Sequence, residues 1–224
     1  MSNATPAPAT TVSSARMITV LGGIAMLSGL LVVLTYQLTY ARIEYNRQQL
    51  IERAVFKVLP GATAQKNFLV DEHGLRPANA GGTGIRIYAA YDGQDQLKGI
   101  ATEAAARGYQ DLVRILYGYD PACDCITGFA VLQSTETPGL GDKIVSDAKF
   151  LANFPLDAKL AGNGQKLANE IVTVKHGSKT DDWQIDAISG ATITSVAVGK
   201  GLNNSAQRLL PLLQPHIDQL QEKN

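Results

Sequence analysis

The sequence predicts an α+β fold, in which an antiparallel sheet with flanking helices follows a single transmembrane helix and a stalk helix. Three observations support this prediction. Positions 17–36 hold no charged residue, strand-like segments separated by turn residues run from 84 to 134, and a long helical pattern covers about 191 to 210. Consecutive strands that precede the main helix are typical of the α+β class.

The uncharged run at 17–36 is long enough to cross a membrane as a helix. With a rise of about 1.5 Å per residue, it matches a hydrocarbon core of about 30 Å. A cleaved signal peptide is the alternative, but its apolar region is usually about 7 to 15 residues long and ends at an A-x-A-like site, which does not follow here. We therefore predict an uncleaved single-pass anchor at 17–40, in contact with membrane lipid. The Ala, Thr, Pro and Ser residues before it predict a disordered tail at 1–16.

A stalk helix is predicted at 41–60, where apolar residues recur at helical spacing and Pro60 and Gly61 form a stop signal. The apolar positions are Ile43, Leu50, Ile51, Ala54, Val55 and Val58. We expect this stripe to pack on the domain that follows, at 61–224.

Basic residues on the two sides of the anchor give a weak indication of its orientation. Arg16 precedes the anchor, and four basic residues follow it: Arg42, Arg47, Arg53 and Lys57. Taken alone, this count places the domain in the cytoplasm. Long domains cross membranes largely regardless of flanking charge, so the count carries little weight.

Composition excludes several classes of protein. The 20 Lys and Arg residues balance 20 Asp and Glu residues, whereas phosphate backbones are bound by a basic surplus, so we predict no nucleic-acid partner. Two cysteines are too few for a disulfide-built scaffold. The three histidines, His73, His176 and His216, are too far apart for metal-ligand spacing, and we predict no metal site.

The domain begins with four predicted strands, at 84–91, 97–105, 111–119 and 126–134. Turn signals such as Asp92-Gly93 separate them, and connections this short join antiparallel neighbours. Helical patterning follows at 142–154, with Asp142 as the expected N-cap. A short strand at 171–175 and the long helix at 191–210 complete the domain.

The start of the last helix is the first informative motif, and residues 186–195 read DAISGATITS. Ser189 is the expected N-cap, and the small residues Gly190 and Ala191 leave the amides of the first turn open to approach. Open amides and the positive end of a helix dipole together bind anions, typically phosphate. Three hydroxyls lie close by, on Thr192, Thr194 and Ser195. The alternative is an ordinary Ser-capped helix start.

A second motif follows the fourth strand, where residues 135–144 read TETPGLGDKI. Pro138 and Gly139 suit the central positions of a type II turn, because proline fixes a negative φ and glycine accepts a positive one. Gly141 gives a second open point of the backbone. Such a loop can lie against a flat ring system with few side chains between them.

Both strings resemble motifs of the FMN-binding domain family. Residues 189–194 match its S/T-G-A-T-x-S/T flavinylation motif, and 136–144 match the E-T-P-G-L-G-D-K-I stretch of the G subunit of Rnf-type ion-translocating ferredoxin:NAD oxidoreductases. The resemblance implies a domain of this family at 61–224, with FMN joined covalently by a phosphoester to Thr194. It implies cofactor contacts by eight further residues: Ser189, Gly190, Ala191, Thr192, Glu136, Thr137, Gly139 and Leu140.

The resemblance also implies a role for the whole chain. That role is an electron-transfer subunit, not catalytic alone, which works with the other integral and peripheral subunits of an Rnf-type complex in a bacterial inner membrane. Its soluble domain is expected on the periplasmic side, against the raw charge count. The C-type subunit of a sodium-translocating NADH:quinone reductase, which shares the attachment motif, is the alternative, as is a membrane-anchored FMN-binding sensory module without electron transfer.

Attachment of the flavin is expected to need a second protein. A threonine hydroxyl is a poor nucleophile, and the sequence supplies no obvious activating base. The family precedent is a metal-dependent flavin transferase that takes FMN from FAD, so that this chain is the substrate of the transfer.

Three further features stay open on sequence alone. Trp183 lies near the attachment motif and either flanks the ring or belongs to the core, which is the commoner place for a tryptophan. Asp181, Asp182 and Asp186 are expected to be solvated rather than to bind a metal, because acidic residues favour helix N-termini. Cys123 and Cys125 allow a disulfide, although a one-residue spacer strains its geometry; a metal shared with a partner chain is the other reading.

Overall fold

The computed structural model describes residues 13–78 and 82–221. Its internal contacts divide the chain between Gln48 and Gln49 into an N-terminal unit and a larger C-terminal unit.

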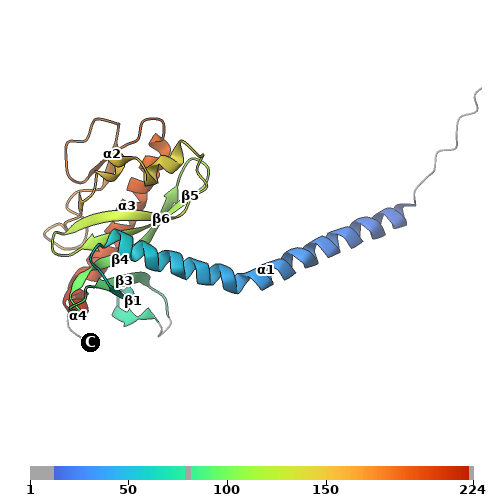
Figure 1. Cartoon of the computed structure of the whole chain (residues 1–224), viewed down its shortest axis with the longest axis horizontal. Coiled ribbons are helices and arrows are strands. Elements are labelled where there is room, and N and C mark those ends of the chain that lie inside the picture. The colour runs from blue at the N-terminus through green and yellow to red at the C-terminus, as the bar shows by residue number, and fades with distance from the viewer. Residues whose placement is uncertain (1–12, 79–81, 222–224) are drawn as a thin grey trace, which may run out of the picture. The chain divides into compact units, whose positions relative to one another are not determined.

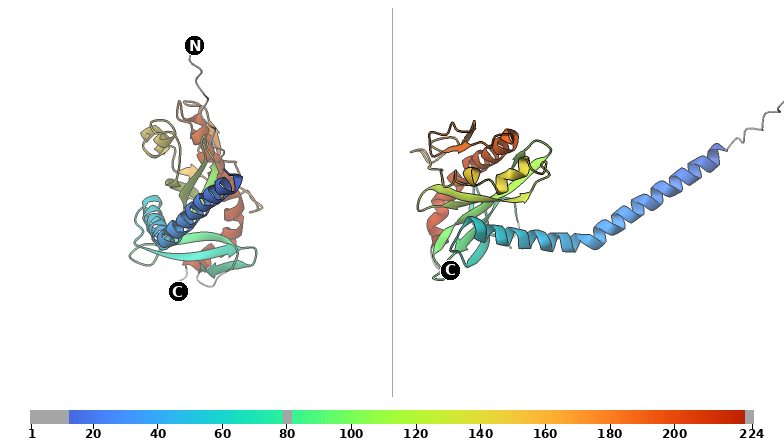
Figure 2. Two further views of the ribbon diagram at one scale, coloured as in Figure 1. Left: turned by 90° about the vertical axis from the view of Figure 1, so that its right-hand side faces the viewer. Right: turned by 45° about the horizontal axis from the view of Figure 1, so that its top comes forward.

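The predicted anchor and stalk form one uninterrupted helix, α1, at Ser14–Val58 (Figure 2). No proline or other stop signal separates the two segments in the sequence, so the helix continues from one into the other. The predicted tail differs in that residues 14–16 are already helical, while its positions 1–12 lie outside the described residues. Within the described ranges, α1 is the one helix long and apolar enough to cross a membrane.

The larger unit is built on a seven-stranded antiparallel sheet with the order β2-β1-β3-β4-β5-β6-β7 (Figure 1). Its strands are β1 at Ala64–Asp71, β2 at Gly74–Pro77, β3 at Ile85–Tyr91, β4 at Leu97–Arg107, β5 at Leu112–Asp120, β6 at Cys125–Gln133 and β7 at Leu156–Asp157.

The four predicted strands and their antiparallel pairing are confirmed as β3 to β6. The strands β1, β2 and β7 were not predicted. β1 mixes exposed polar positions with only two fully buried ones, and β7 has two residues, so neither carries the alternation by which a half-buried strand is recognised.

Both faces of the sheet are buried at β3. Residues 87, 89 and 91 of β3 join the larger core cluster, which includes much of the long helix α3 at Thr192–Leu213, while Tyr88 and Ala90 join a smaller cluster on the opposite face. The smaller cluster is completed by the last turns of α1, through Ile51, Ala54, Val55 and Val58. Four of the six predicted stripe residues therefore pack on the domain, whereas Ile43 and Leu50 are exposed.

The helix predicted at 142–154 is wrong in extent and in its cap. A 3₁₀ helix, η2, occupies Gly141–Val145, and a single α-helical turn, α2, occupies Ala148–Leu151. The side chain of Asp147 caps α2 by accepting a hydrogen bond from the Phe150 amide at 2.9 Å. Asp142 is not an N-cap, because the Gly141 amide already bonds to the Thr137 carbonyl and η2 begins before Asp142.

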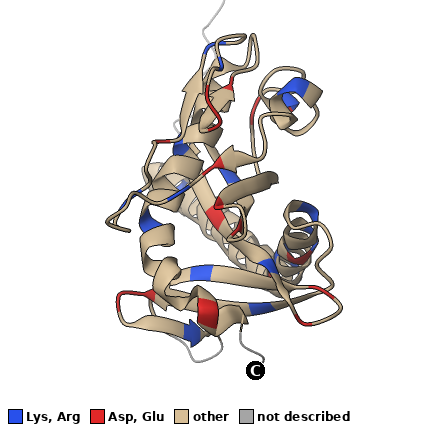
Figure 3. Cartoon of the chain, turned by 90° about the vertical axis from the view of Figure 1, so that its left-hand side faces the viewer, with Lys and Arg blue, Asp and Glu red and all other residues tan. Residues whose placement is uncertain are grey.

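The strand predicted at 171–175 is present as β8, at Val172–Val174. It pairs in parallel with β9 at Gln184–Asp186, forming a separate two-stranded sheet that leads toward α3. The short helices η3, at Gln214–His216, and α4, at Ile217–Gln221, follow α3. Basic and acidic residues are both scattered over the ribbon of the larger unit (Figure 3), in keeping with the even charge balance of the sequence.

Candidate functional site

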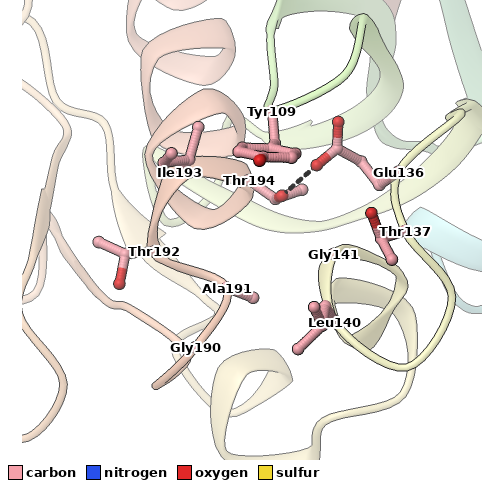
Figure 4. Close-up of a pocket in the computed structure, with 10 residues that line it drawn as sticks. All are labelled: Tyr109, Glu136, Thr137, Leu140, Gly141, Gly190, Ala191, Thr192, Ile193 and Thr194. Atoms are coloured by element: carbon pink, nitrogen blue, oxygen red, sulfur yellow. Dashed lines mark hydrogen bonds between the residues drawn. The ribbon is translucent and has the colours of Figure 1, made fainter.

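A cavity of about 460 Å³ lies between the loop after β6 and the start of α3 (Figure 4). The turn between β4 and β5 contributes Tyr109 to its wall. Its lining residues are Tyr109, Glu136, Thr137, Leu140, Gly141, Gly190, Ala191, Thr192, Ile193 and Thr194. Both sequence motifs therefore meet at one place in the fold.

Thr194 and Glu136, which are 58 positions apart in the sequence, are joined at the base of this cavity. The Thr194 hydroxyl donates a short hydrogen bond to Oε2 of Glu136, and both residues are buried, with 2% and 7% of their surface exposed. The other carboxylate oxygen, Oε1, accepts a hydrogen bond from the Gln110 amide at 3.0 Å. Both oxygens of this buried carboxylate therefore have partners.

The surroundings of Glu136 favour its charged form. Burial raises the pKa of the carboxyl. Hydrogen bonds from the Thr194 hydroxyl and from the backbone amides of Gln110, Tyr109 and Asp111 lower this pKa by more than burial raises it, so the net pKa lies below its ordinary value. Glu136 is therefore an anion near neutral pH, and it acts as a pure acceptor toward Thr194.

Two glycines allow this close packing. A Cβ at Gly141 would lie 2.6 Å from the Glu136 Cβ and 2.9 Å from Oγ1 of Thr194, and a Cβ at Gly108 would lie 2.6 Å from Oε1 of Glu136. Carbon and oxygen atoms do not approach so closely without displacement. Both positions thus require glycine if the carboxylate is to keep its place.

The loop after β6 turns as its sequence predicts. Gly139 has φ of 78°, and the Leu140 amide donates to the Thr137 carbonyl at 3.1 Å, as in a type II turn with Pro138 and Gly139 at its centre. The Thr137 hydroxyl in turn accepts a hydrogen bond from the Gln110 side chain at 3.0 Å. This bond ties the loop to the β4–β5 turn on the other wall of the cavity.

The start of α3 is built differently from the prediction. The N-cap position is Ala191 and has no side-chain cap, so Ser189 is not the cap. Gly190 takes φ of 82°, and this left-handed residue turns the chain just before the helix. The buried hydroxyl of Ser195 holds the turn, because it accepts from the Ile188 amide at 3.1 Å and donates to the Ala191 carbonyl at 3.0 Å.

This arrangement leaves the first turn of the helix directed at the cavity. The first helical backbone bond runs from the Ser195 amide to the Ala191 carbonyl, so the amides of Thr192, Ile193 and Thr194 precede the hydrogen-bonded ladder. Together with the helix dipole, such amides suit an anionic group.

Most of the residues predicted to contact a cofactor line the cavity. These are Thr194, Gly190, Ala191, Thr192, Glu136, Thr137 and Leu140. Gly139 lies in the turn but does not line the cavity, and Ser189 lines a neighbouring, more polar cavity with Lys143, Lys149 and His176. The motifs did not single out Tyr109 or Ile193, whose side chains are 67% and 53% exposed at the cavity.

The other open features find structural places. Trp183 is partly buried; it does not line the cavity and does not belong to the main core cluster. The Asp181 carboxylate accepts from the Gln184 side chain, and Asp186 accepts from the Gly177 amide at 2.6 Å. Cys123 and Cys125 form a disulfide, so the one-residue spacer does not prevent the bond.

Comparison with known proteins gives a consistent set of relatives. A model of the FMN-binding domain family matches residues 108–207, a range that includes every residue lining the cavity. The chain is 30% identical over 216 residues to the G subunit of the ion-translocating oxidoreductase complex of Aliivibrio fischeri, with 95% of each chain covered.

A second relative is the G subunit of the Na(+)-translocating ferredoxin:NAD(+) oxidoreductase complex of Acetobacterium woodii, which is 30% identical over 163 residues, or 72% of this chain and 70% of that one. Among solved structures, the C subunit of the Na(+)-translocating NADH-quinone reductase from Parabacteroides distasonis is similar, with a TM-score of 0.47 and 23% identity over 73% of this chain and 80% of that chain.

Proposed function

This chain belongs to the family of G subunits of ion-translocating oxidoreductase complexes, and from that premise we propose that it is a membrane-anchored electron carrier with FMN joined through its phosphate to Thr194. The electrons pass between other subunits of the complex, which are its partners. The chain does not catalyse a reaction alone, and ion movement belongs to those partners, because the apolar part of α1 holds no charged residue between positions 17 and 36.

The residues of the cavity fit FMN in two respects. Its wall combines the exposed apolar or aromatic side chains of Tyr109, Leu140 and Ile193, which suit the faces of a flat aromatic ring. Its volume of about 460 Å³ lies within the usual range of cofactor sites. When bound, FMN would supply a group that accepts and releases electrons.

The start of α3 suits the phosphate end. The amides of the first helical turn and the positive end of the 22-residue helix favour an anion there. Thr194 is the one cavity hydroxyl that is both in this first turn and hydrogen-bonded to a carboxylate. That contact is the observation that carries the choice of Thr194 over Thr192, which is exposed.

Attachment is a task for a separate flavin transferase that takes FMN from FAD. The test is to express the full chain in cells with and without an active transferase, and to view a denaturing gel under ultraviolet light. We expect a fluorescent band from the wild-type chain with transferase, none from Thr194→Val, and a retained band from Thr192→Val. A wild-type chain that carries no flavin in cells with active transferase overturns the proposal.

Electron transfer has its own test. The flavin absorbance of the purified, detergent-solubilised chain should bleach on chemical reduction and return on reoxidation. A bound flavin that cannot be reduced over the potential range of biological donors supports instead the sensory module without electron transfer.

The proposed location is the bacterial inner membrane, with α1 as a single-pass anchor and the domain on the periplasmic side. The Cys123–Cys125 disulfide supports an oxidising compartment. Because the two native thiols are paired, the test of this location uses a new cysteine for labelling. It replaces the exposed Lys166, and both native cysteines are changed to serine. Labelling of Lys166→Cys in intact spheroplasts by a membrane-impermeant reagent is expected, and protection until the inner membrane is breached overturns this placement.

A further inference from the structure

We propose that Glu136 is the general base for attachment of FMN, receiving the proton that Thr194 loses when its oxygen bonds to phosphorus. This inference rests on the proposed function, since it concerns the same threonine. It assigns a chemical step to a carboxylate that the sequence motifs associate only with the flavin ring, and it supplies the activating group that the sequence alone does not reveal.

The contact has the geometry that a base needs. The Thr194 hydroxyl donates its hydrogen directly to Oε2 of Glu136, within the reach required for proton transfer. A hydroxyl has one hydrogen and two lone pairs. Because the hydrogen points at Glu136, the lone pairs of Oγ1 are directed elsewhere, and Thr194 also lines the open cavity.

The carboxylate is held as a base before any flavin arrives. Its second oxygen is fixed by the Gln110 amide at 3.0 Å, and Gly108 and Gly141 leave room for the carboxylate to be there. The pKa of Glu136 is kept below its ordinary value by these hydrogen bonds, in spite of burial.

The step balances in atoms and charge. Oγ1 of Thr194 forms a bond to the phosphorus of the FMN half of FAD, and the bond from that phosphorus to the bridging oxygen breaks. AMP leaves with the bridging oxygen and its electron pair, and the hydroxyl proton passes to Glu136. No electron is gained or lost. The transferase supplies FAD and the divalent cation, and this chain supplies nucleophile and base.

Protonation of Glu136 also removes a repulsion. Before the step, the negatively charged carboxylate contacts the hydroxyl that becomes part of an anionic phosphodiester, and a carboxylate that stayed charged would repel that phosphate. After the step, the neutral carboxylic acid donates a hydrogen bond instead of repelling the phosphate. The pKa of Glu136 is therefore expected to rise when FMN is attached.

Other titratable groups lie on the elements that pack around Glu136. They are Tyr109 and Asp111 in the β4–β5 turn and the exposed residues Asp142 and Lys143 in η2. The groups that contact the carboxylate itself are the Thr194 hydroxyl and backbone amides. A pH dependence lost in a Glu136 variant is thus assigned to Glu136, whereas Asp111→Asn and Asp142→Asn, which change carboxylates on these elements, should keep the wild-type acid limb.

The test measures attachment, not the activity of the loaded protein. The purified full chain in detergent is mixed with excess flavin transferase, FAD and Mg²⁺, and the fraction flavinylated is followed by intact mass from pH 3 to 9. Glu136→Gln keeps the size of the side chain but removes the base, and at pH 7 it should slow attachment at least about 100-fold. Glu72→Gln, in the exposed β1–β2 turn at the far edge of the sheet, is the matched control and should keep the wild-type rate.

The pH profile separates a chemical role from a structural one. Because the pKa of Glu136 is lowered, the wild-type rate should fall only below about pH 4.3, the ordinary pKa of a glutamate. This acid limb should be absent from the residual rate of Glu136→Gln. Glu136→Asp should recover part of the rate together with the acid limb. A Glu136→Gln variant flavinylated at the wild-type rate, or one that is slow but keeps the same acid limb, overturns the proposal.

Two further outcomes also bear on the proposal. If circular dichroism shows that Glu136→Gln is unfolded, Glu136→Asp is compared with the wild type instead. Its attachment rate should then be at least about tenfold below that of the wild type, with a shifted acid limb. A smaller decrease, or an unshifted acid limb, overturns the proposal. If the wild-type chain takes no FMN, or takes it elsewhere than Thr194, the proposed function fails; if wild type and Glu136→Gln both take it on Thr194 equally fast, only the present inference fails.

Discussion

Gly141 packs so closely on Glu136 that a Cβ at Gly141 would lie 2.6 Å from the Cβ of Glu136 and 2.8 Å from its Oε2. Gly141 is not among the glycines with a positive φ, so the close approach alone requires the absence of a side chain. The Glu136–Thr194 pair therefore depends on a third position that takes no part in their hydrogen bond.

The first prediction concerns Gly141→Ala. The added methyl group must push Glu136 away from the Thr194 hydroxyl, and overpacking of this kind costs about 1 to 3 kcal/mol in the free energy of unfolding. We expect flavin attachment by the transferase to slow at least about tenfold, because general-base catalysis contributes about 10²–10⁴-fold and requires the base to stay within hydrogen-bond reach. Gly128→Ala is the control, because a Cβ at Gly128 meets nothing within 4 Å. An alanine at 141 with normal attachment would falsify the packing argument.

A second prediction concerns the junction between α1 and the sheet. The Thr127 hydroxyl donates to the Val58 carbonyl at 2.6 Å, at the last residue of the helix. Thr127→Val removes the donor and leaves a carbonyl without this partner, which costs about 1 to 3 kcal/mol. Urea unfolding of the full chain in detergent measures it, with the exposed Thr192→Val expected to stay within about 0.5 kcal/mol of the wild type. Equal stability of the two variants contradicts the assignment.

The third prediction is a pH dependence of stability. Because the pKa of Glu136 is lower in the folded chain than its ordinary value, its contribution is fully present above the unfolded pKa of about 4.3 and is lost as the pH falls through the folded pKa. The difference in unfolding free energy between wild type and Glu136→Gln should therefore be largest at neutral pH and shrink below about pH 4. A difference that grows with acidity reverses the sign and contradicts the prediction.

A fourth prediction concerns the disulfide. With Cys123 and Cys125 paired, neither sulfur should react with an alkylating reagent in the unfolded chain until a reductant is added, after which intact mass should show two modifications. Closing so short a loop stabilises the fold little, by about 2 kcal/mol or less in the chain-entropy model. Replacing both cysteines with serine should leave flavin attachment unchanged, because neither cysteine lines the cavity. Alkylation without reductant shows that the thiols are free.

Local patterns in the sequence were enough to predict the centre of the fold. The strands β3 to β6 alternate or run apolar and are punctuated by turn residues, and their pairing follows from the short connections. The Pro138-Gly139 turn was also predictable from local sequence, because the φ angles that a type II turn requires are set by two adjacent residues.

Tertiary contacts decided what the sequence left hidden. Ser189 and Asp142 are residue types that often cap helices. The turn at Gly190 places the N-cap of α3 at Ala191 instead. The hydrogen bond from the Gly141 amide to the Thr137 carbonyl makes the 3₁₀ helix begin before Asp142. The bond between Glu136 and Thr194 joins residues 58 positions apart, and no local pattern specifies such a pairing. The motifs thus identified the two walls of the cavity but not the contact between them.

The most direct test of covalent FMN on Thr194 is fragmentation mass spectrometry of the tryptic peptide 180–200, which runs from the residue after Lys179 to Lys200. The peptide holds five hydroxyl residues: Thr180, Ser189, Thr192, Thr194 and Ser195. In chains matured by a flavin transferase, we predict that the mass of one FMN, less water, is carried by Thr194 alone. FMN on another of these residues, or an unmodified peptide from fluorescent protein, would contradict the assignment of Thr194 as the attachment site.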